Sequence, residues 1–299
     1  MDSIQSLDDI DPLIAHELLY TGSSPAWTCV SDPRFCYFLY IPRNYYTLPK
    51  TTGSLNLIVL IHGSGRNPYT LRREFSSFAE QHGCALLAPL FPVGLIDPQD
   101  TVNYKYIKYK DVRYDRVLLA MIDEAAARFG RIDTSRFCLY GFSGGGQFVH
   151  RFAYLHSRRV AALACGAPGT QTLLDWERKF PDGVEDWQDV FDAPIDLQAV
   201  KDIPTMFVAG DRDTDIFYAI ARGRIREDQR GDEEVMAKFR DGRYGATTRL
   251  CKNWQQVGVK ECVMVGVEGA GHEERPMLES VKAFFERFIN TKRDEATRG

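Results

Sequence analysis

The stretch Phe137–Leu155, FCLYGFSGGGQFVHRFAYL, predicts a strand, a tight turn and a helix in immediate succession. Its first four residues, Phe137–Tyr140, form an apolar run of strand length and composition. A turn, Gly141-Phe142-Ser143-Gly144-Gly145, comes next. Beyond it, apolar residues recur at the i, i+4 and i+7 spacing of a helix, at Phe148, Phe152 and Leu155.

A Gly-x-Ser-x-Gly turn between a strand and a helix is the pattern of a nucleophile elbow. Such a turn is strained and lifts the serine hydroxyl out of the sheet, so Ser143 is the candidate nucleophile. Gly141 and Gly145 carry no Cβ that would clash with the neighbouring strand and helix. A bare Gly-x-Ser-x-Gly can arise by coincidence, but the flanking strand and helix favour the functional interpretation.

Composition limits the classes of protein that the chain can belong to. It has 299 residues, 44% of them hydrophobic, which suits one large α/β domain or two small ones. We expect a single domain, 1–299, because we see no linker, internal repeat or low-complexity tract. The net charge of −4 and the scattered basic residues argue against a nucleic-acid partner.

Targeting and redox signals point to a cytoplasmic protein. No apolar run reaches the ~18 residues of a transmembrane helix, and MDSIQSLDDIDP lacks the basic and apolar regions of a signal peptide. We therefore expect no membrane association. The seven cysteines are odd in number and scattered, which favours buried free thiols over disulfides. Without a CxxC or HExxH pair, we expect no metal and no organic cofactor.

Apolar runs of strand length alternate with helical patterns from residue 55 onward. Leu55–Ile61 is almost continuously aliphatic, as expected of a strand buried on both faces. The alternation predicts an α/β fold with a mostly parallel central sheet flanked by helices. Two antiparallel strands, Trp27–Val30 and Phe35–Ile41, are expected to precede it. Residues 170–201 interrupt the rhythm and are predicted to form a small cap insertion.

A serine nucleophile needs a base, usually a histidine oriented by a carboxylate. Of the six histidines, only His272 lies in a glycine-rich loop after a strand near the C-terminus. A histidine in such a loop is ordinarily a surface residue, but a parallel sheet gathers its sites at this edge. For the acid, Asp213 is preferred over Asp211, a turn residue, and Asp215, a helix cap, although spacing alone leaves Asp215 open.

These motifs and their order resemble the α/β-hydrolase superfamily, in particular compact esterases of the dienelactone-hydrolase and feruloyl-esterase type. The matching pieces are HGSGRN at 62–67, GFSGG at 141–145, GDRD at 210–213 and GAGHEERP at 269–276. The resemblance implies the α/β-hydrolase fold and the triad Ser143, Asp213 and His272. It also implies an oxyanion hole formed by the backbone N–H groups of Ser64 and Gly144, with Gly65 as an alternative to Ser64.

Three further residues are candidates for substrate binding, each with a structural alternative. Arg66 would meet a carboxylate on the substrate or form a structural salt bridge, and the second is favoured because surface arginines are common. Trp176 and Trp187 would line an apolar acyl pocket, or simply pack the cap against the sheet.

The sequence therefore predicts a cytoplasmic serine hydrolase that cleaves a carboxylic ester, lactone or thioester through an acyl-enzyme on Ser143. Its expected partner is a small-molecule acyl substrate, either free or presented by a carrier protein. The alternative enzyme is a thioesterase that releases a carrier-bound chain in a biosynthetic pathway. An alternative of another class is a catalytically silent ligand receptor that retains the hydrolase fold.

Overall fold

A computed structural model describes residues 21–49, 53–98, 100–215, 233 and 242–289. The chain divides into two compact units. Unit 1 comprises Met1–Leu139, Arg158–Ala162 and Lys282–Gly299, and unit 2 comprises Tyr140–Ser157 and Leu163–Val281. The expectation of a single domain over 1–299, part of which lies outside the described residues, stays a prediction.

Unit 1 contains the antiparallel edge of the sheet and the first parallel strands. Its strands follow the order β1-β2-β4-β3-β7-β8, where β7 and β8 continue into unit 2. Strand β2 pairs antiparallel with both β1 and β4, whereas β3 and β4 are parallel. The strands are β1 (Gly22–Thr28), β2 (Cys36–Ile41), β3 (Leu55–Ile61), β4 (Ala85–Leu90), β7 (Ile132–Phe142) and β8 (Val160–Gly166). All of β3 is buried except the half-buried Asn56, as its aliphatic run predicts.

Helices α2 (Pro68–His82) and α3 (Tyr114–Arg128) belong to unit 1. Helix α2 packs on β2 and β4. It begins where the Asn67 side chain accepts a hydrogen bond from the Thr70 N–H, and it ends at Gly83, whose φ of 59° suits glycine. The loop between β4 and α3 holds η3 (Asn103–Tyr106) and a short hairpin of β5 (Lys108–Tyr109) and β6 (Val112–Arg113).

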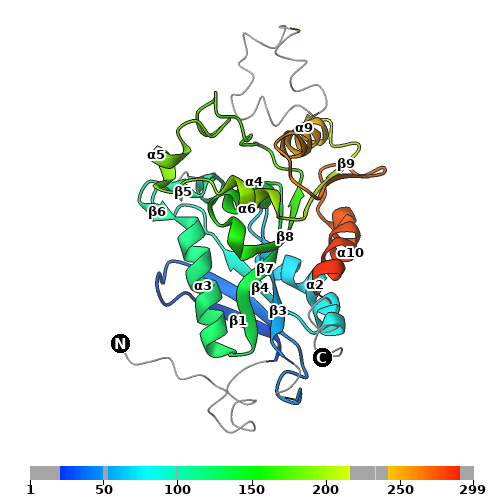
Figure 1. Ribbon diagram of the computed structural model, residues 1–299. Helices are drawn as coiled ribbons and strands as arrows, with labels where there is room; N and C mark the ends of the chain where they lie inside the picture. Colours follow the sequence, from blue (N-terminus) through cyan, green and yellow to red (C-terminus); the bar gives the residue numbers. More distant parts are fainter. Residues whose placement is uncertain (1–20, 50–52, 99, 216–232, 234–241, 290–299) are drawn as a thin grey trace. The chain divides into compact units, whose positions relative to one another are not determined.

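Unit 2 contains the other end of the sheet, in the order β7-β8-β9-β10. Strand β9 (Thr205–Gly210) is parallel to both β8 and β10 (Cys262–Val267). Helix α9 (Gly242–Gln256) packs on β9 and β10, as Figure 1 shows. The remaining elements are α4 (Gly144–Leu155), η4 (Ser157–Arg159), α5 (Trp187–Phe191), α6 (Leu197–Lys201), η6 (Arg275–Met277) and α10 (Leu278–Ile289), of which η4 and α10 extend into unit 1. The predicted mostly parallel sheet flanked by helices is confirmed.

The first strand differs from the sequence-based prediction. We expected Trp27–Val30, but β1 runs over Gly22–Thr28 and contains Pro25. Proline cannot donate a ladder hydrogen bond and is confined to edge strands and bulges. Both conditions hold here, because β1 lies at the edge of the sheet and its register with β2 shifts between Ser23 and Ala26.

The described helices are all too short or too polar to traverse a bilayer. All seven cysteines are free thiols, and all but the half-buried Cys36 are buried, as the sequence predicts. Within the described ranges, no group of three or more histidine, cysteine, aspartate and glutamate side chains is arranged to hold a metal ion.

The segment 170–201 is anchored on helix α4. The buried Arg151 donates to the hydroxyls of Thr172 and Thr170, at 2.8 and 3.2 Å. His150 Nε2 accepts the Thr172 N–H at 3.1 Å, while Nδ1 lies 2.7 Å from the Gly146 carbonyl. The ring is therefore neutral with its proton on Nδ1, and burial lowers its pKa well below the ordinary value.

Trp187 is the centre of an aromatic cluster in unit 2. Its side chain is 2% exposed. Its ring centroid lies 4.2 Å from that of Phe191, 5.5 Å from that of Tyr154 and 5.9 Å from that of Phe180. Trp176, by contrast, is 50% exposed. The two tryptophans of this segment therefore have different roles, and Trp187 serves packing.

We predict that Trp187→Ala lowers the free energy of unfolding by about 3–5 kcal/mol, because it leaves a cavity among three aromatic rings. Trp176→Ala, the matched control, should change it by less than about 1 kcal/mol. Urea unfolding followed by circular dichroism measures both. Equal losses in the two variants would contradict the assignment of Trp187 to the core.

Candidate active site

Ser143 adopts a strained backbone conformation between β7 and α4. Its φ of 54° and ψ of −108° lie in a region that residues with a Cβ rarely adopt. Such strain costs on the order of 1–3 kcal/mol and persists only where the surroundings impose it. The Ser143 N–H donates to the Gly166 carbonyl at 2.8 Å, and the Ser143 carbonyl accepts the first helical bond of α4, from Gln147. The residue is thus held from both sides.

Close backbone contacts explain the glycines around this turn. A Cβ on Gly141 would lie 2.5 Å from the carbonyl carbon of Gly145, and one on Gly146 would collide with the carbonyl oxygen of Gly166. Gly141 and Gly145 were predicted to allow this approach. The requirement at Gly146 was missed, because its partner Gly166 lies on a different strand, β8.

His272 lies within hydrogen-bond distance of both Ser143 and Asp213. The distance from His272 Nε2 to Ser143 Oγ is 3.0 Å, and that from Nδ1 to Asp213 Oδ2 is 2.6 Å. The imidazole stacks on Phe142, with ring centroids 4.9 Å apart. A carboxylate only accepts, so Nδ1 carries the proton and Nε2 is free to accept the serine proton. All three side chains belong to unit 2, and the structure brings them together in one chain of hydrogen bonds.

Asp213 is the only one of the three candidate acids placed against His272. Its side chain is 1% exposed, whereas Asp211 and Asp215 are exposed residues. The Asp211 carboxylate accepts the Gly269 N–H at 2.8 Å. Asp211 therefore ties the loop after β9 to the loop that carries His272, which agrees with its predicted role as a turn residue.

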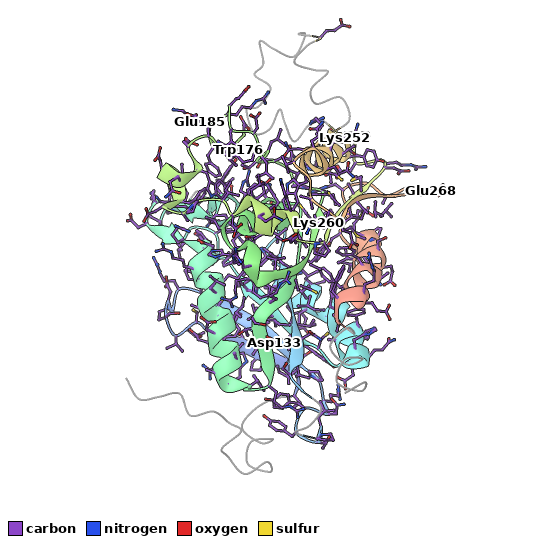
Figure 2. The ribbon with its side chains drawn as sticks, viewed as in Figure 1. Asp133, Trp176, Glu185, Lys252, Lys260 and Glu268 are labelled. Atoms are coloured by element: carbon purple, nitrogen blue, oxygen red, sulfur yellow. The ribbon has the colours of Figure 1, made fainter. Side chains whose placement is uncertain are left out.

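The loops after β9 and β10 lie directly against each other. Arg212 N–H donates to the Ala270 carbonyl at 3.0 Å, and a Cβ on Gly210 would collide with that same carbonyl. Glu268 extends outward from the start of the His272 loop, as Figure 2 shows. Parallel pairing of β9 and β10 thus brings Asp213 and His272 to one sheet edge although they are separated by 59 residues.

Arg243 also contacts Asp213, and the sequence analysis missed it. Arg243 Nη1 lies 3.3 Å from Asp213 Oδ1, the carboxylate oxygen that does not face His272. Arg243 is in the first turn of α9, 30 residues after Asp213. No motif links the two positions, so the pair is visible only in three dimensions.

The two candidate oxyanion donors belong to different units. Gly144 is the first residue of α4, where a backbone N–H has no acceptor within the helix. Ser64 follows β3 in unit 1, and its carbonyl accepts a hydrogen bond from Arg66 at 3.0 Å. A role for Ser64 or Gly65 beside Gly144 stays a prediction.

Arg66 uses its guanidinium to hold the loop after β3. It donates to the carbonyls of Ser64, Phe91 and Thr101 and to the Asn103 side chain, at distances from 2.9 to 3.3 Å. It also lies over the ring of Tyr104. This corresponds to the structural alternative for Arg66, with hydrogen bonds in place of the expected salt bridge.

His62 fixes the start of the same loop. Its Nε2 accepts the Phe91 N–H at 3.0 Å, and Nδ1 lies 2.9 Å from the Gly63 carbonyl. The ring is therefore neutral with its proton on Nδ1. Burial is the largest cause that lowers its pKa, from 6.5 to about 4, and the positive charges of Arg66 and Lys105 add to it.

Trp176 lines a surface groove of about 600 Å³ in unit 2. Lys252, from α9, also lines this groove, and Figure 2 labels both residues. The groove is open to solvent. Acidic and basic residues both line it, including Glu177 and Arg249. The prediction that 170–201 caps the site and that Trp176 binds substrate stays a prediction.

No family model and no curated protein matches this sequence. Solved structures do match. Poly(aspartic acid) hydrolase-1 from Sphingomonas sp. KT-1 has a TM-score of 0.67 at 20% identity, over 89% of this chain and 98% of the other. A poly(3-hydroxybutyrate) depolymerase from Bordetella parapertussis has a TM-score of 0.66 at 20% identity, over 97% of this chain and 99% of the other. A siderophore hydrolase from Aspergillus nidulans has a TM-score of 0.56 at 14% identity, over 91% of this chain and 95% of the other.

The chain has the α/β-hydrolase fold. The predicted fold class is confirmed over nearly the whole length of these structures. At 20% identity or less, the similarity shows the fold alone.

We predict that His62→Gln flattens the pH dependence of stability. The unfolded chain protonates His62 below its ordinary pKa of 6.5, whereas the folded chain does so only near 4. The stabilisation that His62 contributes in its neutral form is therefore fully present above pH 6.5 and is lost as the pH falls toward 4. The loss between pH ~7.5 and ~5 amounts to about 2 kcal/mol.

Glutamine keeps an acceptor for the Phe91 N–H but does not titrate. Urea unfolding of both proteins at the two pH values provides the test. The variant should lose about 2 kcal/mol less than wild type on acidification. An identical loss in both proteins would contradict a neutral, buried His62.

Proposed function

We propose that this protein is a serine hydrolase that cleaves a carboxylic ester or a related acyl bond. The single observation that carries the proposal is the hydrogen-bonded chain from Ser143 Oγ through His272 to Asp213 Oδ2, with distances of 3.0 and 2.6 Å. A base in contact with a hydroxyl, and an orienting carboxylate behind it, is the arrangement that activates a serine nucleophile. The strained turn at Ser143 supports the same role.

In the proposed reaction, Ser143 Oγ attacks the acyl carbonyl carbon while its proton passes to His272 Nε2. The carbonyl electrons move to the oxygen, which becomes an oxyanion. Asp213 holds the Nδ1 proton in place and stabilises the imidazolium that forms. His272 then donates its proton to the leaving alkoxide or thiolate, and the acyl group remains on Ser143. Water then attacks the acyl-enzyme carbonyl carbon while His272 Nε2 takes its proton, which gives a second tetrahedral intermediate. When this intermediate collapses, the bond to Ser143 Oγ breaks, Oγ takes back the proton from His272, and the carboxylic acid is released.

The proposed oxyanion hole uses the Gly144 N–H and one N–H from the loop after β3, at Ser64 or Gly65. Gly144 is suited to this role because its N–H stands at the start of α4 and next to the nucleophile. The partial positive charge of the helix N-terminus favours the developing negative charge. Each donor of this kind is worth on the order of 10²–10³-fold in rate.

The proposed substrate is a carboxylic ester, lactone or thioester, since all three present the same carbonyl to the serine. The names of the structures with the same fold, a poly(3-hydroxybutyrate) depolymerase and a siderophore hydrolase among them, support a hydrolytic role. The mechanism uses only groups of this chain and water. A cytoplasmic location and independence of a metal or cofactor are part of the proposal.

We predict that Ser143→Ala lowers kcat by about 10⁴–10⁶-fold while the melting temperature stays near that of wild type. The assay is hydrolysis of short p-nitrophenyl esters, together with labelling by a fluorophosphonate. Wild type should be labelled at Ser143 and should turn over. Labelling without turnover of any acyl substrate would favour the receptor alternative, and near-normal turnover by folded Ser143→Ala would overturn the proposal.

The same assay separates the three aspartates. Asp213→Asn should lower kcat by about 10⁴-fold, because the neutral amide no longer stabilises the imidazolium and favours the wrong tautomer. Asp211→Asn is the matched control, since an asparagine oxygen still accepts the Gly269 N–H. Asp215→Asn is the exposed control. A large loss in Asp215→Asn with an active Asp213→Asn would show that the acid is wrongly assigned.

A further inference from the structure

We propose that Arg243 is a positioning residue for the reaction at Ser143 and acts through Asp213. The inference rests on the proposed function, and it assigns a role to a residue that no motif indicates. The two oxygens of the Asp213 carboxylate have different partners. Oδ2 faces His272 Nδ1 at 2.6 Å, and Oδ1 faces Arg243 Nη1 at 3.3 Å.

The backbone holds the start of α9 against Asp213. The Tyr244 N–H donates to the Asp213 carbonyl at 3.0 Å. Gly242 has a φ of +52°, and a Cβ at this position would lie 2.7 Å from the same carbonyl and collide with Thr214. The approach of the helix to the acid therefore requires glycine immediately before Arg243. Both the main chain and the side chain of this turn contact Asp213.

Burial makes the second partner of the carboxylate important. The Asp213 side chain is 1% exposed and that of Arg243 is 18% exposed, so water cannot readily replace the guanidinium. A buried carboxylate with one oxygen unpaired is costly and is free to rotate about its Cβ–Cγ bond. A donor on Oδ1 fixes the plane of the carboxylate, and with it the direction in which Oδ2 meets the imidazole.

The charge of Arg243 has a second consequence. A cation beside the Asp213–His272 pair favours the ionised carboxylate and disfavours the imidazolium, because like charges repel. Removal of that charge should therefore raise the pKa of His272. Substitution by lysine keeps the charge but replaces the planar guanidinium with a single ammonium group. The two effects, orientation and charge, can thus be measured separately.

Besides Asp213 and Arg243, other charged and titratable groups lie on the segments around His272, and they stay constant in the comparison. Asp213 contacts His272 and Arg243 contacts Asp213, and of these two groups only Arg243 is changed. The others come from the loops after β9 and β10 and from the first turn of α9, and they are Asp211, Arg212, Glu268, Glu273, Glu274 and Tyr244.

The test compares Arg243→Gln and Arg243→Lys with wild type. Lys260→Gln is the matched charge control, because it removes one cation of unit 2 that pairs with Asp202 at 2.5 Å and is 71% exposed. Three readouts are needed: the pKa of His272 from NMR titration of ¹⁵N-histidine-labelled protein, kcat and KM on one p-nitrophenyl ester across the pH range, and the melting temperature.

In Arg243→Gln the NMR titration of His272 and the acid limb of kcat/KM should both move to higher pH. The plateau kcat at high pH should fall about tenfold with KM unchanged, because the imidazole is less well oriented. Arg243→Lys should keep the wild-type pKa of His272 and lose only about threefold in kcat. Lys260→Gln should match wild type in both.

A folded Arg243→Gln with a wild-type His272 pKa and a wild-type plateau kcat would overturn the inference, even if its melting temperature falls. Should Arg243→Gln not fold, Arg243→Lys decides, and a changed His272 pKa in that variant would overturn it. The NMR titration does not require turnover. If wild type neither hydrolyses esters nor reacts with a fluorophosphonate, the proposed function fails, while the coupling of Arg243 to His272 is still read directly.

Discussion

The buried carboxylate of Asp213 is the group on which the rest of the candidate site depends. A carboxylate removed from water is costly unless charges and hydrogen bonds compensate it. Asp213 obtains them from two separate elements, the loop after β10 through His272 and the start of α9 through Arg243. The close approach of Gly210 to Ala270, and of Gly242 to Asp213, brings both elements within reach. The sheet edge is thus organised around one side chain.

The strain at Ser143 is the second constraint, and packing of glycines imposes it. Gly141 and Gly146 allow β7, β8 and α4 to approach more closely than a Cβ permits, and the Gly166 carbonyl then accepts the Ser143 N–H. The cost of the unusual backbone is offset by the surrounding strands and helix. In the proposed reaction, a serine held in this way would already be placed for its attack on the acyl carbonyl.

Much of this arrangement was predictable from the sequence, for identifiable reasons. Strand β3 was predicted with both of its ends because it is a short, almost continuously aliphatic run. The Ser143 turn was found because strand, turn and helix are consecutive. A feature that consecutive residues form, such as a strand or the turn that follows it, can be inferred from a single sequence.

The missed features depend on contacts between distant positions. Pro25 concealed β1, because a proline is compatible with a strand only at an edge that the sequence does not reveal. Gly146 and Arg243 have partners on other elements, Gly166 and Asp213. The roles of Trp176 and Trp187 were equally open, and only burial separates them.

If Ser143 forms the proposed acyl-enzyme, the mass of the protein changes during turnover. Wild-type protein mixed with p-nitrophenyl acetate and quenched in acid within milliseconds should gain the mass of one acetyl group. Peptide mapping should place that group on Ser143. Turnover of the ester with no covalent adduct, or an adduct on a residue other than Ser143, would show that Ser143 is not the nucleophile.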